Sequence, residues 1–360
     1  MDPRDLSDHG VYRPGGGPEE IARERGGSPD DYVKLSSNEN ALGPSPKAVE
    51  AMRTTAARAN VYPTTAHTDL TEALARRWDL PPEQVWLGPG ANGALDYLYR
   101  AVLDPGEEIL TPDPGYPYYP KGAHYHNGTV GGRYALRKDD DWAQTADRVL
   151  DAYDGERFVF VTTPHNPTGS EMPMAEIRTL RERLDDDTLL VVDEAYGEFT
   201  DAPSARSLLD DRDDVAVLRT FSKVYGLAGI RVGYALVPGV WADAYDHVNS
   251  PFAVSELACR AGLAALDDDE HVRESVELVR WSRAYMHDEL DARTWESASN
   301  FLLAEVGDSA AIARACEERG VIVRDCADPP WNADGCIRIT CGTPESTRRA
   351  VETINDVLAE

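Results

Sequence analysis

The sequence predicts an α/β protein with a mostly parallel sheet, followed by a smaller α+β region. Short apolar runs alternate with helical patterns between residues 84 and 237, which is typical of βαβ units. Several of these runs are apolar throughout, as expected for strands that are buried on both faces. After about residue 240, longer helical stretches and short strands replace this alternation. The chain of 360 residues also exceeds the size at which a single core usually stops growing.

The elements expected in the first part follow from periodicity and from turn residues. Helices are expected at residues 18–24, 46–58, 68–78, 94–103, 142–153 and 174–184, with Thr68 as a possible N-cap. Strands are expected at residues 84–87, 108–111, 157–162, 188–192, 215–219 and 232–237. Polar or glycine-rich loops follow most of the strands, and in open α/β sheets ligands bind beyond the carboxyl ends of strands.

The second part is expected to form helices at residues 240–248, 255–266, 270–290, 309–319 and 344–358, and strands at 300–306, 321–324 and 336–340. The helix at 270–290 is a candidate spine between two domains. We therefore predict an N-terminal arm at residues 1–45, a large domain at 46–248 and a small domain at 249–360. The Pro- and Gly-rich start of the arm is expected to be either a disordered tail or a segment that wraps a neighbouring subunit.

The composition excludes several classes of partner. The formal net charge is −28, from 64 acidic and 36 basic residues, so binding to nucleic acid is not expected. No leader and no apolar run of 18 residues occurs, which predicts a cytoplasmic protein without a membrane partner. The acidic runs at 139–141, 185–187 and 267–269 are expected on solvated loops and helix ends. Such a charge predicts a halophilic environment and a fold that loosens at low salt.

The five cysteines are odd in number and none is paired in CxxC spacing. This spacing predicts neither a disulfide framework nor a zinc site, so no metal is expected.

Lys223 is the first candidate for a catalytic residue. It lies in a loop of small residues between the apolar runs 215–219 and 232–237, and it is the only lysine in the second half of the chain. Most lysines are solvated surface charges. A desolvated lysine near other cations can instead act as a nucleophile and form a Schiff base.

Other groups at predicted strand ends complete a chemical pattern. Asn166, Asp193 and Tyr196 follow two of the strands, Arg231 follows Lys223, and a glycine turn at 90–93 precedes a helix. A buried carboxylate needs a charged or hydrogen-bonding partner, and a helix N-terminus after a glycine turn can hold a phosphate. Pyridoxal phosphate requires a lysine, an acid for its ring nitrogen and a phosphate site, so these groups together predict this cofactor.

The motifs that carry this pattern resemble those of the fold-type I pyridoxal-phosphate aminotransferases, whose large domain has a mostly parallel seven-stranded sheet. The wider pattern resembles that of histidinol-phosphate aminotransferases, and the resemblance runs from about Tyr12 to the C-terminus. It rests on the segments Asn38-Glu39-Asn40, Tyr62-Pro63, Asn166-Pro167-Thr168-Gly169, Asp193-Glu194-Ala195-Tyr196, Arg219–Lys223, Leu227-Ala228-Gly229, Gly320–Arg324 and Arg338–Thr343.

The resemblance implies roles for residues around the cofactor. Lys223 would bond to the cofactor aldehyde and then move the proton at the substrate α-carbon. Asp193 would keep the ring nitrogen protonated, Asn166 and Tyr196 would bind the phenolate oxygen, and Tyr116 would stack on the ring. The phosphate would be held by Thr220, Ser222, Arg231, the amides of Ala91 and Asn92, and Tyr62 of a second subunit.

The resemblance also implies a substrate site and a homodimer. Arg324 and Arg338 would bind the phosphate of histidinol phosphate and, in the other half-reaction, the carboxylates of glutamate. Asn40 and a partner's Tyr12 would line the same pocket. The implied reaction is transfer of the amino group from L-histidinol phosphate to 2-oxoglutarate in L-histidine biosynthesis.

Departures from the family pattern leave the substrate open. Ala41 replaces a usual proline, His165 replaces a usual asparagine, and the loop at 325–335 is divergent. The alternatives are an aromatic amino acid aminotransferase and a threonine-phosphate decarboxylase of the same fold. A non-catalytic regulator on this fold is disfavoured, because the chain has no length for a DNA-binding module and retains Lys223.

Overall fold

A computed structural model describes residues 17–63, 65–327, 329 and 331–360. It confirms the α/β fold class. A seven-stranded sheet has the order β2-β8-β7-β6-β5-β3-β4, and only β8 runs antiparallel to its neighbours. Its strands are β2 (Val85–Gly88), β3 (Glu108–Asp113), β4 (Thr129–Ala135), β5 (Phe158–Thr162), β6 (Leu189–Asp193), β7 (Val215–Thr220) and β8 (Gly233–Leu236).

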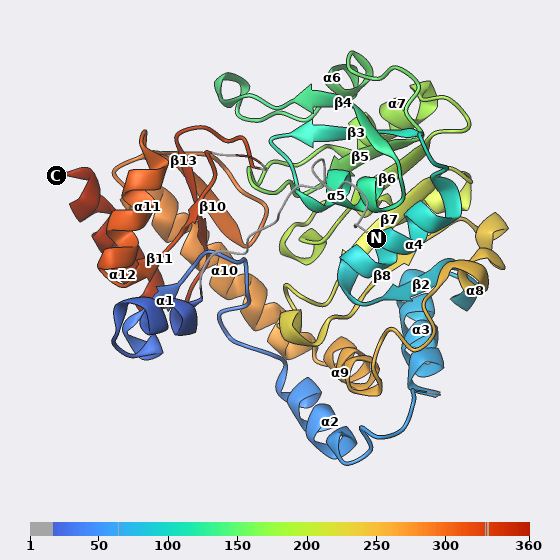
Figure 1. The fold of residues 1–360 in the computed structure, drawn as a ribbon, viewed down its shortest axis with the longest axis horizontal. Coiled ribbons are helices and arrows are strands. Elements are labelled where there is room, and N and C mark those ends of the chain that lie inside the picture. Colours follow the sequence, from blue (N-terminus) through green and yellow to red (C-terminus); the bar gives the residue numbers. More distant parts are fainter. Residues whose placement is uncertain (1–16, 64, 328, 330) are drawn as a thin grey trace, which may run out of the picture.

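Helices pack on both faces of this sheet (Figure 1). Successive side chains of a strand point to opposite faces, and along β5 they divide between two separate cores: Phe158 and Phe160 in one, Val159 and Val161 in the other. The helices of this part are α2 (Pro46–Ala56), α3 (Thr65–Trp78), α4 (Gly90–Val102), α5 (Tyr118–Tyr125), α6 (Ala146–Leu150), α7 (Met174–Arg183), α8 (Ala244–Val248) and α9 (Glu256–Leu266). Because both faces are covered, the inner strands β5, β6 and β7 are buried along their whole length and are largely apolar, as predicted.

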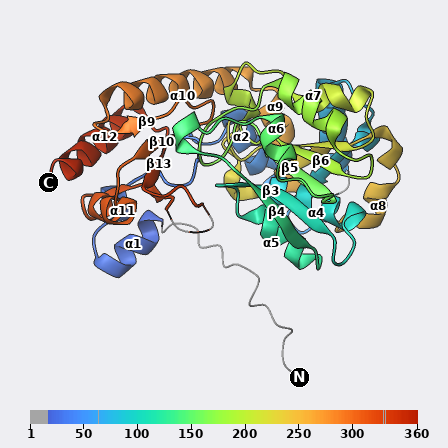
Figure 2. The ribbon, with the colours of Figure 1, turned by 90° about the horizontal axis from the view of Figure 1, so that it is seen from above.

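The C-terminal part contains a four-stranded antiparallel sheet with the order β12-β13-β10-β9. Its strands are β9 (Arg293–Thr294), β10 (Phe301–Glu305), β12 (Arg324–Asp325) and β13 (Cys336–Thr340), and its helices are α11 (Ser309–Glu318) and α12 (Pro344–Leu358). The long helix α10 (Asp269–Glu289) reaches from α9 toward α12 (Figure 2). It lies where the sequence placed a spine.

The described N-terminal segment joins the C-terminal part. After α1 (Pro18–Arg25), strand β1 (Val33–Lys34) pairs in parallel with β11 (Val321–Ile322). The chain then runs past the carboxyl edge of the large sheet before α2 begins at Pro46. The proposed domain boundaries remain a prediction.

Three local expectations were wrong. The glycine turn at 90–93 is itself the first turn of α4, and Thr68 lies inside α3 instead of capping it. Helix α5 and strand β4 lie in stretches for which no element was expected. The helix expected from Trp142 begins only at Ala146, because Asp141 and Trp142 adopt positive φ angles of 54° and 60°. The sequence did not predict strand β4, because a largely exposed edge strand with two glycines lacks the apolar run of a buried strand.

The acidic runs are mostly exposed, but Asp268 is an exception. Its side chain is buried and accepts a hydrogen bond from Ser45 Oγ at 2.6 Å. None of the described helices is long and apolar enough to cross a membrane.

Candidate active site

A cavity of about 190 Å³ opens at the carboxyl ends of β5, β6 and β7. Parallel strands bring their ends to one edge of the sheet, so residues far apart in sequence meet there. The sequence-predicted residues that line it are Ala91, Asn92, Tyr116, Asn166, Asp193, Tyr196, Thr220, Ser222, Lys223, Arg231 and Arg338. The structure thus brings together the residues predicted to hold the cofactor ring and phosphate, with Tyr62 as the exception.

Lys223 is held by backbone carbonyls of the N-terminal segment. Its Nζ lies 3.2 Å from the Asn38 carbonyl oxygen and 3.4 Å from that of Ser37. Burial, followed by the nearby Arg338 guanidinium, lowers the pKa of Lys223 to about 7. A large fraction of the amine is therefore neutral at physiological pH, and the neutral amine is the form that attacks a carbonyl group.

Asp193 ends β6 and is 5% exposed. Its Oδ2 accepts a hydrogen bond from the Tyr119 hydroxyl at 2.7 Å, and its Oδ1 accepts one from the Ala195 amide at 3.0 Å. Within the described chain no cationic side chain forms an ion pair with it, and burial raises the pKa of Asp193. A buried acid of this kind can be matched by a cationic ligand such as a pyridinium N–H.

An anion site lies at the start of α4. Gly90 has a φ of +77°, and a Cβ atom there would lie 2.3 Å from Nη2 of Arg231. Only glycine therefore lets this guanidinium approach the helix N-terminus, whose first amides have no partner inside the helix. Arg231 Nη1 donates to the Ala228 carbonyl at 2.8 Å and lies 3.4 Å from Ser222 Oγ. The Thr220 hydroxyl donates to Ser222 Oγ at 2.9 Å, so these hydroxyl groups face the same site.

The cavity walls between these groups suit a flat ring. Tyr116 lines one side, and its hydroxyl donates to Asn92 Oδ1 at 3.2 Å. On another side the Tyr196 hydroxyl accepts a hydrogen bond from Asn38 Nδ2 at 2.9 Å. Asn166 Oδ1 accepts from Arg338 at 2.5 Å, which orients the amide group of Asn166.

Arg338 forms a second anion site at the other end of the cavity. It is 3% exposed, its Nη2 donates to the Ser36 carbonyl at 2.8 Å, and its Nε has no hydrogen-bond partner in the part of the chain that the structure describes. The guanidinium lies over the rings of Trp331 and Phe301, at 4.9 and 5.3 Å from their centroids. No carboxylate of the described residues forms an ion pair with it. A buried guanidinium without a counter-ion is suited to bind an anionic ligand.

Three of the predicted site residues that the structure describes do not line the cavity. Asn40 donates to the Val224 carbonyl and to Ser275 Oγ, so its amide supports the loop that follows Lys223. Arg324 reaches the Ser36 carbonyl from outside, at 3.4 Å. Tyr62 is 72% exposed and stacks on Phe252 at 4.7 Å, and Tyr12 lies outside the described residues. Their roles in the site stay predictions.

Several residues of the site were not identified from the sequence. Tyr119 and Thr162 contact each other beside Asp193, Trp331 covers Arg338, and Asn38 orients Tyr196. Two of them could have been found from the sequence, because Asn38 belongs to the Asn-Glu-Asn motif and Trp331 belongs to the divergent loop at 325–335. That loop is tied to the end of β3 by a hydrogen bond from Asn332 to Asp113, at 2.7 Å.

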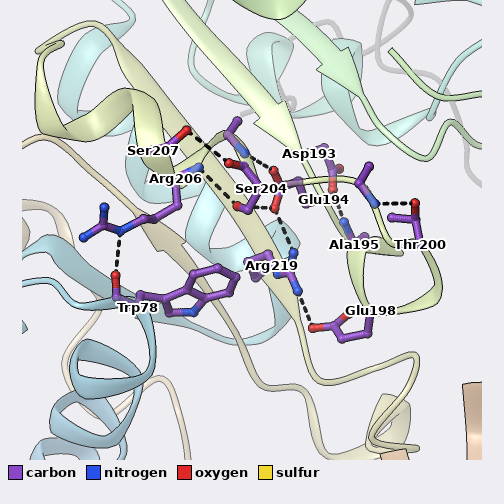
Figure 3. Close-up of polar contacts among 12 residues, drawn as sticks. Trp78, Asp193, Glu194, Ala195, Glu198, Thr200, Ser204, Arg206, Ser207 and Arg219 are labelled. Carbon is purple, nitrogen blue, oxygen red and sulfur yellow. Dashed lines mark hydrogen bonds and ion pairs between the residues drawn. The ribbon is translucent and has the colours of Figure 1, made fainter. Parts of the chain in front are cut away.

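Behind the cavity, a buried cluster supports the β6 and β7 ends. Glu194 and Glu198 both contact the Arg219 guanidinium, at 2.8 and 2.5 Å, as Figure 3 shows. The Trp78 ring lies 4.9 Å from the same guanidinium. Since Glu194 follows Asp193 and Thr220 follows Arg219, this cluster fixes the backbone on which two cavity residues stand.

The donor set fits pyridoxal phosphate. One anion site lies among hydroxyl groups and helix amides, an acid without a counter-ion is available for a ring nitrogen, and an amine with a lowered pKa is available for an aldehyde. A second anion site remains for the substrate at Arg338.

Comparison with known proteins agrees with this geometry. The sequence model described as aminotransferase class I and II matches residues 30–354. The chain is 62% identical to a histidinol-phosphate aminotransferase of Haloarcula marismortui, over all of this chain and 99% of that protein. It is 60% identical to the protein of the same name from Haloferax volcanii, with the same coverage.

A solved structure is also similar along nearly the whole chain. It is a histidinol-phosphate aminotransferase from Sinorhizobium meliloti in complex with pyridoxal-5'-phosphate. The TM-score is 0.83 at 30% identity, and the match covers 96% of this chain and 95% of the other.

Proposed function

The chain belongs to the aminotransferase class I and II family, and from this premise we propose that it is a histidinol-phosphate aminotransferase. It transfers the amino group of L-histidinol phosphate to 2-oxoglutarate and gives 3-(imidazol-4-yl)-2-oxopropyl phosphate and L-glutamate, a step of L-histidine biosynthesis. The observation that carries this proposal is the pairing in one cavity of a Lys223 amine of pKa about 7 with a buried Arg338 guanidinium that has no counter-ion among the described residues. Full-length relatives at about 60% identity bear this name.

Pyridoxal 5'-phosphate is the cofactor. When bound, it supplies an electron-withdrawing ring that stabilises negative charge at the substrate α-carbon. Asp193 would accept the ring N–H and keep the nitrogen protonated, while Asn166 and Tyr196 would direct their polar groups to the phenolate oxygen. Lys223 would carry the proton between the substrate α-carbon and the cofactor. Arg231, Thr220 and Ser222 would hold the phosphate together with the α4 amides.

Arg338 is proposed to bind the anion of each substrate in turn. Its two-pronged guanidinium can hold a phosphate or a carboxylate with paired hydrogen bonds. The rings of Trp331 and Phe301 exclude water around it, which strengthens the contact with an anion. Arg324 and Asn40 are proposed to support this site from outside the cavity, through Ser36 and the loop after Lys223.

A homodimer is proposed on the basis of exposed apolar side chains near the predicted phosphate ligand Tyr62. Val61 is 47% exposed and Phe252 is 58% exposed beside it. In this proposal Tyr62 and Tyr12 serve the partner's site, residues 1–45 act as an arm, and the large and small domains meet near residue 248.

We place the enzyme in the cytoplasm, in the high salt that its acidic composition and its haloarchaeal relatives suggest.

The test is a half-reaction in molar KCl. The yellow enzyme is mixed with L-histidinol phosphate in the absence of a keto acid, and the visible absorbance of the cofactor bonded to Lys223 is followed. A stoichiometric loss of that band that 2-oxoglutarate reverses supports the proposal. Loss with L-tyrosine or L-phenylalanine alone would point to an aromatic aminotransferase, and release of CO2 from threonine phosphate would point to the decarboxylase. A protein that takes up no pyridoxal phosphate would refute the proposal.

A further inference from the structure

The three tyrosines of the turn after β3 have different environments. Tyr116 lines the cavity, and Tyr118 is half-buried at the start of α5. Tyr119 is 1% exposed, and it lines the cavity beside Asp193 and the end of β5 (Phe158–Thr162). The family resemblance implies a role for Tyr116 but none for Tyr119.

The Tyr119 hydroxyl contacts the two residues that face each other on β5 and β6. It lies 2.7 Å from Asp193 Oδ2 and 2.8 Å from Thr162 Oγ1, and Thr162 is the register partner of Asp193. An ionised carboxylate can only accept hydrogen bonds, so the Tyr119 O–H donates to Asp193. The Thr162 hydroxyl is then free to donate to the Tyr119 oxygen.

The Tyr119 ring is held in place by other aromatic rings. It stacks on Phe160 at 4.4 Å with an interplanar angle of 14°, and Tyr116 meets it edge-on at 5.5 Å. The Tyr99 hydroxyl also donates to the Tyr119 backbone carbonyl, at 2.8 Å. The hydroxyl position is therefore set by the packing on both sides of the ring, and it in turn sets the position of Asp193 Oδ2.

We propose that Tyr119 is the positioning residue of Asp193: its O–H holds the buried carboxylate ionised and aimed at the ring nitrogen of the cofactor. This inference rests on the proposed function, because it requires a pyridine ring in the cavity. Among the described residues, Asp193 has no ion pair that would stabilise its charge, and its Oδ1 accepts one hydrogen bond, from the Ala195 amide. A hydrogen bond to an ionised acceptor is about twice as strong as a neutral one, so Tyr119 supplies a large part of what keeps the carboxylate charged.

Tyr134 offers a matched control. It is also 1% exposed, and its hydroxyl donates at 2.8 Å to the backbone carbonyl of Phe160, the residue on which Tyr119 stacks. Its partner is a neutral carbonyl and it does not line the cavity. Tyr119→Phe and Tyr134→Phe thus each remove one buried hydroxyl group that contacts strand β5. Only the Tyr119 hydroxyl also contacts Asp193.

The experiment measures dissociation constants of two ligands for the full-length protein in molar KCl. One ligand is pyridoxal phosphate, and the other is its 1-deaza analogue, in which a C–H group replaces the ring nitrogen. Tyr119→Phe should weaken binding of pyridoxal phosphate by about 10- to 100-fold, the range for a hydrogen bond to a charged group. It should change binding of the deaza analogue by less than about 3-fold, because that ligand does not use Asp193. Tyr134→Phe should leave the ratio of the two constants unchanged.

A second comparison isolates the carboxylate. In an Asp193→Asn background, adding Tyr119→Phe should have little further effect on pyridoxal phosphate binding, because the charge that Tyr119 supports is gone. If Tyr119→Phe does not fold, Thr162→Val takes its place and should shift the ratio in the same direction by a smaller factor.

The outcomes separate this inference from the proposed function. The inference alone would be overturned if Tyr119→Phe weakened the binding of both ligands equally. It would also be overturned if Tyr119→Phe weakened pyridoxal phosphate binding as much in the Asp193→Asn background as in the parent. Either result would show that Tyr119 only supports the fold. Failure of the unmodified protein to bind pyridoxal phosphate would overturn the proposed function instead.

Discussion

At the carboxyl ends of β6 and β7, the charged side chains that line the cavity lack counter-ions among the described residues, whereas those packed behind the cavity form ion pairs with each other. Asp193 and Glu194 are consecutive and almost equally buried, at 5% and 4% exposure. Glu194 lies 2.8 Å from the Arg219 guanidinium, whereas Asp193 has only hydrogen bonds from a hydroxyl and an amide (Figure 3 shows the Glu194 side). The same contrast separates Arg219, which has two carboxylate partners, from Arg338, which has none among the described residues.

This difference shows which charges belong to the fold and which to a ligand. A buried charge is costly unless it is paired and hydrogen-bonded. On the buried side the protein supplies both members of each pair. On the cavity side it supplies one member only, and the cost appears as a lowered pKa for Lys223 and a raised pKa for Asp193, both caused first by burial. In the proposed function, the cofactor and the substrate would supply the missing members.

Loss of Lys223 should have the largest effect on activity and almost none on stability. Lys223→Ala removes the group that is proposed to move the α-proton, so turnover should fall by about 10⁴-fold, the upper end for loss of a general acid–base group. The unfolding midpoint should be unchanged or slightly higher, because a desolvated amine is removed. Steady-state kinetics and urea unfolding check this. Residual turnover above a tenth of that of the parent would contradict it.

Loss of Arg219 should have the reverse pattern. Arg219→Met leaves Glu194 and Glu198 buried without their cation, which should destabilise the protein by about 3–5 kcal/mol. Urea unfolding measures this, with Glu194→Gln and Glu198→Gln added to Arg219→Met as the compensated control. If stability were retained and only turnover fell, the division between a structural and a ligand side would be wrong.

Loss of Arg338 should weaken substrate binding without destabilising the fold. Arg338→Met should raise the KM for histidinol phosphate by about 100-fold, as expected for loss of paired hydrogen bonds to an ion. The unfolding free energy should stay the same or rise, since no protein carboxylate loses its partner. Arg338→Lys keeps the charge but not the fork and should recover only part of the affinity. A destabilisation as large as that of Arg219→Met would contradict the assignment.

The smallest expected effect is the pH dependence of the rate at which Lys223 bonds to pyridoxal phosphate. Because the pKa of Lys223 is lowered to about 7, the neutral amine predominates above pH 7. The rate at which the cofactor-free protein bonds pyridoxal phosphate should therefore rise between about pH 6 and pH 8 and then level off. Arg338→Met removes a repelling charge, so it should shift this profile to higher pH. A rate that keeps rising up to pH 10 would mean that the amine is not desolvated.

The sequence by itself determined the cofactor edge of this protein. Asn166, Asp193 and Lys223 each follow an apolar strand, and parallel strands end at one edge. Residues that follow successive parallel strands therefore come together, and local motifs were sufficient to predict that Asn166, Asp193 and Lys223 line one cavity. The long C-terminal helices were predicted to within a few residues because their periodicity is strong.

Only the tertiary structure decided which groups complete each pair. Asn38 reaches Tyr196 across 158 residues of sequence, and Arg338 reaches the Ser36 carbonyl across 302. Three tyrosines within four positions look alike in sequence, yet Tyr119 alone meets Asp193, since the start of α5 turns it inward. Burial and hydrogen-bond partners come from contacts between distant segments, and these contacts separate a charge kept for a ligand from one that holds the fold together.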